Sequence, residues 1–187
     1  MGIVLAVVSG CFVPASIPAD QVAPPFKGQG VDQEHYSLLD LALKGPVLVI
    51  FVPKSCDLAH PRLVFSNLLA KAYKGKVSTL GVYGGSDKEL SDWSMEVDSD
   101  FPWIPDPGLL IAEKYGFESG PVAMIISQRG KIEGRWTKWD RTEFTAMNEM
   151  LAKLTNQPPA KIDVTSAPTT AVAPCIYTLP QRDFSKP

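Results

Sequence analysis

Hydrophobic runs along the chain predict the strands of a sheet. The run from Val47 to Val52 is apolar on both faces, as expected for a central strand in a sheet that is covered on both sides. Residues 77–83 form a second apolar run that stops at two glycines. Residues 119–127 and 131–139 predict a hairpin, because a turn-forming Gln-Arg-Gly sequence separates them.

Between these strands, apolar residues recur at helical spacing. Ser86 with Glu89 has the pattern of a capping box, and Asp140 is suited to cap the last helix. A strand, a helix and a second strand in this order predict a parallel pair with a right-handed crossover. The predicted helices cover residues 58–73, 86–97, 109–115 and 140–154, with a shorter helix or turn at 36–43.

Length and composition indicate one domain with appendages. The chain has 187 residues, which is enough to bury a core without disulfide staples. We divide it into a leader and tether at 1–21, a folded domain at 22–155, and a Pro/Thr/Ala-rich tail at 156–187 that we expect to be extended or disordered. The formal net charge of -2, with scattered Lys and Arg, argues against a nucleic-acid partner.

The amino-terminal segment has the form of an export signal. Its apolar run is too short to span a bilayer and is followed by small residues. Val8-Ser9-Gly10-Cys11 resembles the bacterial lipobox, in which the cysteine carries the lipid, although no Lys or Arg precedes Lys27. We therefore expect an exported protein of the cell envelope, periplasmic or anchored to the membrane only through a lipid on Cys11. The alternative is a cytoplasmic protein with a fortuitous apolar leader.

Cys56 is the candidate nucleophile. It lies between the end of the buried strand and the start of a helix, where the partial positive charge of the helix terminus favours thiolate over thiol. The neighbouring carboxylate of Asp57 acts in the opposite direction. The alternative is a half-buried cysteine that acts only as a small apolar residue.

The order of these elements resembles the thioredoxin-like superfamily, in the branch that holds extracytoplasmic thiol:disulfide oxidoreductases and the redoxin (AhpC/TSA) antioxidant proteins. The resemblance covers residues 23–154 and implies an α/β fold, a three-layer α/β/α sandwich with a mixed central sheet. It rests on the segments VLVIFVPKSC, FPWIPDPGLLIAEKYGF and GPVAMIISQRGKI and on the final helix, in that order.

The resemblance also assigns candidate site residues. It implies that Cys56 is the first cysteine of the family's Cys-x-x-Cys motif, and that Gly120 and Pro121 form a cis-proline loop against which an extended substrate pairs. Ala59 replaces the second cysteine, so dithiol exchange within the motif is excluded. Candidate assisting residues are His60 and Ser55, the latter at the position of a usual tryptophan, and Cys175 in the tail is a candidate resolving cysteine.

The peroxiredoxin pattern fits this sequence in a different register. Counting from Pro53, the family's hydroxyl residue falls on Asp57 and its peroxidatic cysteine falls on His60. Cys56 therefore stands in the oxidoreductase position.

Three functions remain open at this point. The first is thiol-disulfide exchange through Cys56, with protein or small-molecule thiols and disulfides as partners and an external reductant. The second is a redox-inactive binding module that uses the Pro121 loop, and the third is an antioxidant peroxidase. We expect no cofactor, and no metal site, since the two histidines, His35 and His60, lie on different elements.

Overall fold

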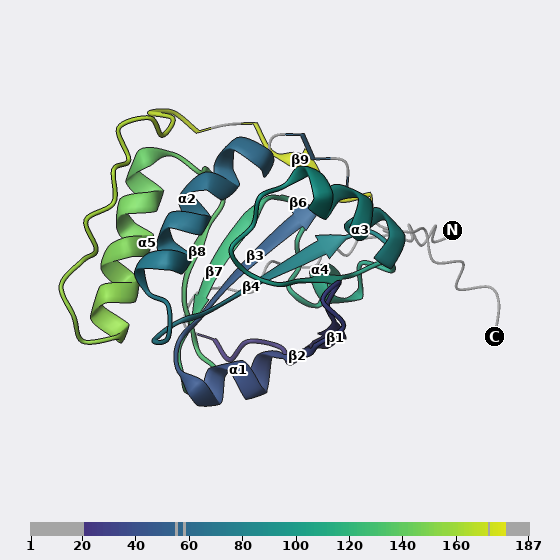
Figure 1. Ribbon diagram of the computed structural model, residues 1–187, viewed down its shortest axis with the longest axis horizontal. Coiled ribbons are helices and arrows are strands. Elements are labelled where there is room, and N and C mark those ends of the chain that lie inside the picture. Colours follow the sequence, from purple (N-terminus) through teal and green to yellow (C-terminus); the bar gives the residue numbers. More distant parts are fainter. Residues whose placement is uncertain (1–20, 55, 58, 172, 179–187) are drawn as a thin grey trace, which may run out of the picture.

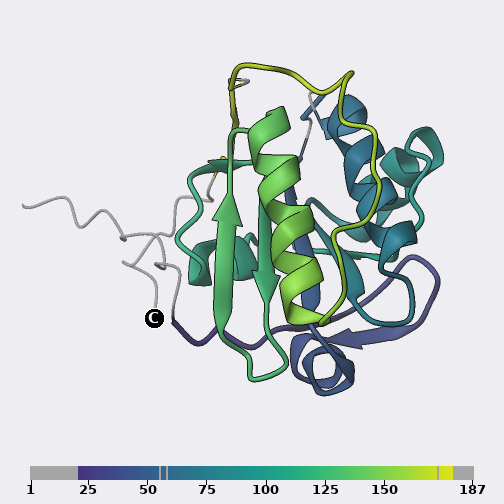
Figure 2. The same ribbon diagram turned by 90° about the vertical axis from the view of Figure 1, so that its left-hand side faces the viewer.

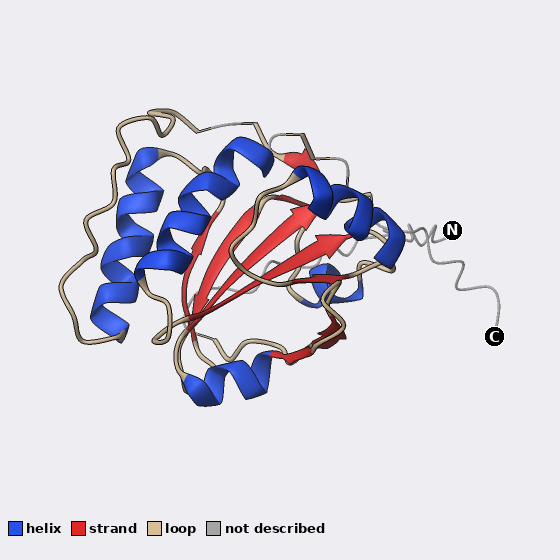
Figure 3. Ribbon diagram, viewed as in Figure 1, coloured by secondary structure: helices blue, strands red, loops and turns tan. Residues whose placement is uncertain are grey.

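A mixed five-stranded sheet forms the centre of the molecule (Figures 1 and 3). The computed structural model describes residues 21–54, 56–57, 59–171 and 173–178, without the side chains of residues 60–62. The strand order is β5-β4-β3-β7-β8, in which β3, β4 and β5 are parallel and β7 is antiparallel to both of its neighbours. The strands are β3 (Val47–Pro53), β4 (Ser78–Gly84), β5 (Trp103–Pro105), β7 (Val122–Ile126) and β8 (Ile132–Trp136).

Two short antiparallel pairs lie outside this sheet. One joins β1 (Lys27–Gln29) to β2 (His35–Ser37) near the amino end of the domain. The other joins β6 (Ser119–Gly120), directly before β7, to β9 (Cys175–Ile176) in the carboxyl-terminal tail.

Helices cover both faces of the sheet (Figures 1 and 2). One apolar core receives buried side chains from α2, α3 and α5, and the other from α1 and α4. The three-layer α/β/α fold class predicted from the sequence is confirmed. The helices are α1 (Leu38–Lys44), α2 (Ala59–Ala72), α3 (Asp87–Glu96), α4 (Leu110–Lys114) and α5 (Arg141–Leu154).

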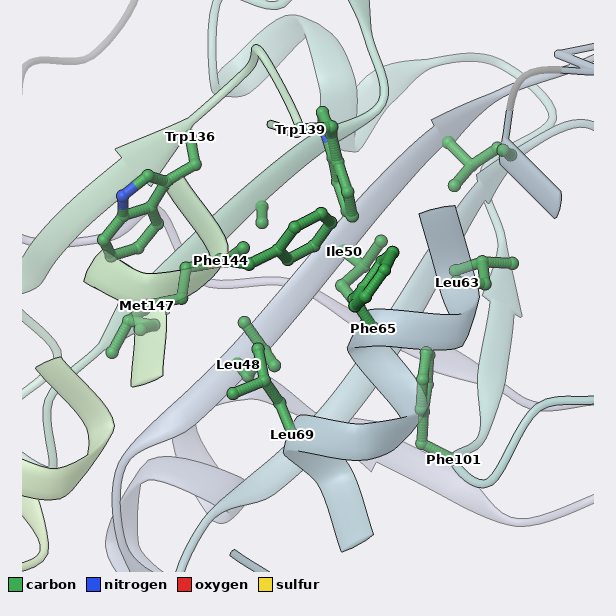
Figure 4. Close-up of a cluster of buried hydrophobic side chains, with 14 of the residues drawn as sticks. Leu48, Ile50, Leu63, Phe65, Leu69, Phe101, Trp136, Trp139, Phe144 and Met147 are labelled. Carbon is green, nitrogen blue, oxygen red and sulfur yellow. The ribbon is translucent and has the colours of Figure 1, made fainter. Parts of the chain in front are cut away.

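Strand β3 contributes to both cores because successive side chains point to opposite faces. Leu48, Ile50 and Val52 enter the core under α2 and α5, whereas Val47, Val49 and Phe51 enter the core under α1 and α4. Figure 4 shows the first core, where Phe65 of α2 meets Phe144 of α5 with ring centroids 4.5 Å apart. The strand that leads to Cys56 is therefore fixed from both sides.

Most predicted elements are present, with shifted boundaries. The parallel β3–β4 pair, the β7–β8 hairpin and the Ser86 capping box are confirmed. The predicted strand at 119–127 is divided at Pro121 into β6 and β7, and β8 ends at Trp136 rather than at residue 139. No sequence pattern predicts β1, β2, β5 or β9, which are only two or three residues long.

The tail after α5 runs back along that helix in extended form (Figure 2). Ala167 is buried, and the backbone N–H of Arg141 donates to the carbonyl of Pro168 at 2.7 Å. Asn148 Nδ2 donates to the carbonyl of Ala160 at 2.8 Å. The sequence pattern beyond Thr155 had no periodicity that could predict this packing.

None of the helices in the described part of the chain is long and apolar enough to cross a membrane.

Candidate active site

Cys56 lies where the sequence predicts it, between the carboxyl end of β3 and the first turn of α2. Its side chain is 2 % exposed, and its carbonyl accepts a hydrogen bond from the N–H of Ala59 at 3.0 Å. The first turn of α2 carries no acidic residue, so no carboxylate from that turn offsets the partial positive charge of the helix terminus. Asp57, which precedes the helix, is exposed.

Cys56 forms a disulfide with Cys175. The two Cα atoms are 5.7 Å apart, although 119 positions separate the residues in the sequence. Both cysteines are candidate site residues by sequence, but nothing in their spacing predicts that they meet. The structure joins them because the tail crosses back over the end of the sheet to reach β6.

A cis-proline loop borders this disulfide. The Gly120–Pro121 peptide bond is cis, and Trp139 Nε1 donates to the carbonyl of Pro121 at 2.6 Å in a buried position. A Cβ atom on Gly120 would lie 2.7 Å from Cδ of Pro53, at the end of the strand that leads to Cys56. Glycine is therefore required at this close approach.

Strand β9 occupies the free edge of β6 beside the loop. Gly120 lies opposite Cys175, and Ser119 lies opposite Ile176. The N–H of Tyr177 extends the pairing by donating to the carbonyl of Glu118 at 2.9 Å. The tail thus lies on the edge that the family resemblance assigns to an extended substrate.

Tyr177 is a site residue that the sequence analysis missed. Its side chain is buried, and burial together with the nearby Asp106 carboxylate raises its pKa well above the ordinary value. The sequence signal was weak, since a lone tyrosine in a tail with many prolines does not by itself predict burial. Its spacing of two residues from Cys175 is the one available clue, because strand residues i and i+2 face the same side.

A pocket of about 430 Å³ adjoins the tail strand. Lys54 and Glu89 form an ion pair among its lining residues. The bond to Lys54, with further bonds from Ser86, lowers the pKa of the Glu89 carboxyl to about 2. Glu89 in turn raises the pKa of the Lys54 ammonium group.

Other predicted residues contribute no described side chain to the site. Ser55 and Cys11 lie outside the described residues, and His60 belongs to α2 with its side chain outside the description. In the part of the chain that the structure describes, no cluster of three or more His, Cys, Asp or Glu side chains could hold a metal ion.

A family comparison covers most of this architecture. Residues 19–135 match the family model for AhpC/TSA proteins. The chain belongs to the AhpC/TSA family. The matched range contains Cys56 and the Pro121 loop, whereas α5 and the tail with Cys175 lie beyond it. No curated protein matches the chain.

Solved structures with the same fold include thiol-disulfide oxidoreductases and a peroxidoxin. The thioredoxin domain of a thiol-disulfide oxidoreductase from Bacteroides vulgatus has 18% identity and a TM-score of 0.64, covering 73% of this chain and 99% of its own. The pneumococcal exposed lipoprotein thioredoxin from Streptococcus pneumoniae has 23% identity and a TM-score of 0.61, with coverages of 70% and 100%. Peroxidoxin BcpB from Mycobacterium tuberculosis has 16% identity and a TM-score of 0.59, with coverages of 74% and 96%. At these identities the likeness establishes the fold.

Proposed function

We propose that the protein is a thiol-disulfide oxidoreductase in which Cys56 is the nucleophile and Cys175 is the resolving cysteine. The observation that carries the proposal is the Cys56–Cys175 disulfide beside the cis-Pro121 loop. Ala59 removes the resolving cysteine that such motifs usually hold, and the tail supplies a sulfur in its place.

The reaction needs two exchange steps. The Cys56 thiolate attacks one sulfur of a substrate disulfide, and the other substrate sulfur leaves as a thiolate that takes a proton from water. The Cys175 thiolate then attacks Cys56 Sγ, which forms the Cys56–Cys175 disulfide and releases the second substrate thiolate. The substrate gains two electrons and the protein loses two, and an external dithiol restores the reduced pair.

Location and partners follow from the same chemistry. Protein disulfides persist mainly in oxidising compartments, where a protein that exchanges them meets its substrates, so the proposed chemistry supports a place outside the cytoplasm. The pneumococcal protein of the same fold is named an exposed lipoprotein, which supports the proposed role of Cys11 as a lipid attachment site. The partners would be protein or small-molecule thiols and disulfides, with an external reductant.

Trapping of the mixed disulfide tests the mechanism. The reduced full-length chain with Cys11→Ser is mixed with a peptide disulfide, and the adducts are measured by mass spectrometry. We expect Cys175→Ser to accumulate the adduct on Cys56, whereas the chain with both cysteines releases the peptide and forms its internal disulfide. Cys56→Ser is the matched control and should form neither the adduct at position 56 nor the internal disulfide.

Two outcomes would reject this mechanism. If Cys175→Ser turns over as fast as the chain with both cysteines, Cys175 is not the resolving residue. If Cys56 reacts with hydrogen peroxide to a sulfenic acid but not with any disulfide, the protein is a peroxidase.

A further inference from the structure

The side chain of Tyr177 fills a slot built from two glycines. A Cβ atom on Gly84 would lie 3.1 Å from Cε1 of the tyrosine ring, and a Cβ atom on Gly120 would lie 3.2 Å from Cε2. The ring joins the apolar core that contains Leu109 and Phe117. The slot therefore has room for a flat aromatic side chain only because both flanking positions lack a side chain.

The side chains of the tail strand other than Cys175 and Tyr177 lie in solvent. Ile176 is 68% exposed, and its neighbours Pro174 and Thr178 are exposed as well. Cys175 and Tyr177 face the protein on either side of Ile176, as the alternation of a strand requires. Three features thus hold the segment: the disulfide, the β6 pairing and the buried ring.

We propose that Cys175–Tyr177 lies in the substrate site as a substrate would, so that its sequence indicates which polypeptides the site binds. These are extended polypeptides that have a cysteine followed two residues later by an aromatic side chain. The inference rests on the proposed function and adds the substrate class to it. The intervening position is unselective because the residue that occupies it, Ile176, points to solvent.

Reduction of the Cys56–Cys175 bond removes the covalent one of the three attachments that hold the tail strand in the site. The tail strand then remains held by its short pairing with β6 and by the Tyr177 ring, while Ala167 keeps the preceding chain packed on the domain. The adjoining pocket counts Ile176, Tyr177 and Thr178 among its lining residues, so departure of the strand would widen it. The tethered tail strand competes with a substrate polypeptide for the site at an effective concentration on the order of millimolar. A substrate must bind tightly enough to displace the tail at that concentration.

Return of the tail would couple the second exchange step to product release. The Cys175 thiolate reaches Cys56 when β9 pairs with β6 again, and the same pairing displaces the bound polypeptide from that edge. A single movement of the tail then brings about both the resolution of the mixed disulfide and the release of the product.

The test uses peptides carrying one cysteine activated as a 2-pyridyl disulfide. The reduced full-length chain with Cys11→Ser, Cys175→Ser and Tyr177→Ala has Cys56 as its single thiol and an empty slot. Release of pyridinethione is measured for the sequences Cys-Ile-Tyr, Cys-Ala-Tyr and Cys-Ile-Ala within otherwise identical peptides, each normalised to the rate with 2,2′-dipyridyl disulfide.

We expect both tyrosine peptides to react about ten- to a hundredfold faster than Cys-Ile-Ala at subsaturating concentration, the advantage of burying an aromatic side chain. Restoring Tyr177 should reduce this advantage, because the tail competes for the slot. Gly84→Ala should also reduce it, since the added methyl group narrows the slot.

The outcomes separate the two proposals. Equal normalised rates for the three peptides would overturn the substrate inference while leaving thiol-disulfide exchange intact. Absence of reaction with the peptides and with dipyridyl disulfide would reject the proposed function itself. A tyrosine preference that is unchanged by Gly84→Ala and by restoring Tyr177 would place the aromatic side chain elsewhere and overturn the inference.

Discussion

Gly120 and Cys175 lie directly opposite each other in the antiparallel pairing of β6 with β9. Gly120 precedes the cis-proline, and Cys175 is bonded to Cys56. The cis-proline loop and the tail strand therefore meet beside the sulfur of Cys56, the residue that follows the end of β3. Loss of the disulfide should first loosen the pairing of β6 with β9.

Reduction of the disulfide should lower the free energy of unfolding. The bond closes a loop with a sequence separation of 119, and such a cross-link stabilises mainly by restricting the unfolded chain. We expect a loss of about 2–4 kcal/mol, measured by urea unfolding of the Cys11→Ser chain with and without dithiothreitol. The Cys56→Ser, Cys175→Ser double variant should be insensitive to the reductant. A reductant effect of the same size in the double variant would contradict this assignment.

Amide exchange should report local release of the tail. The N–H of Tyr177 bonds to the carbonyl of Glu118 in a strand pair of two residues, whereas Met124 lies in the middle of β7 between two neighbouring strands. On reduction we expect much faster deuterium uptake in the segment that contains Tyr177 and unchanged protection around Met124. Equal protection of the tail before and after reduction would show that β9 stays bound without its disulfide.

Gly81→Ala should destabilise the sheet. A Cβ atom there would lie 2.1 Å from the ring of Trp103, and that ring is packed against Trp93 at a centroid distance of 4.8 Å. We expect a loss of about 1–3 kcal/mol in thermal or urea unfolding. Gly108→Ala is the matched control, since its nearest contact would be 3.5 Å, and it should change stability by no more than about 0.5 kcal/mol. Equal effects of the two substitutions would refute the steric explanation.

The pH dependence of stability should contain a contribution from Glu89. Its folded-state pKa of about 2 is below the ordinary value, so its contribution is complete above the unfolded-state pKa and is lost as the pH falls through about 2. The stability difference between the wild type and Glu89→Gln should therefore shrink as the solution is acidified below about pH 4.3, the ordinary glutamate pKa. An NMR titration of Glu89 should give a higher midpoint in Lys54→Gln. A midpoint that is ordinary in both chains would contradict the role of the ion pair.

Asp106→Ala should weaken the start of α4. The buried carboxylate accepts hydrogen bonds from the N–H of Ile111 at 3.0 Å and from the N–H of Ala112 at 2.9 Å. Loss of this acceptor leaves buried donors unpaired, which costs about 1–3 kcal/mol in the free energy of unfolding. Asp106→Asn keeps one oxygen acceptor and should lose less. An Asn variant as unstable as the Ala variant would indicate that the negative charge, not the hydrogen bonds, is required.

The sequence predicted the framework because the framework depends on local patterns. The continuous apolar run of β3 requires a strand that is covered on both faces, and Ser86 with Glu89 caps α3 through contacts three residues apart. The position of Cys56 at the strand-to-helix turn follows from the same local information. The chain order of β3, α2 and β4 likewise determines their parallel pairing.

The site was completed by contacts that no local pattern encodes. Cys175 reaches Cys56 only because the tail packs along α5 and then pairs with β6, and each of these steps depends on residues far away in the chain. The proline-rich sequence around Tyr177 does not predict that its side chain is buried. Its burial depends on a slot that Gly84 and Gly120 form after the sheet has assembled. Residue type and short-range periodicity thus determined the strand, the helix and the candidate nucleophile, whereas tertiary packing decided which sulfur and which aromatic ring lie beside it.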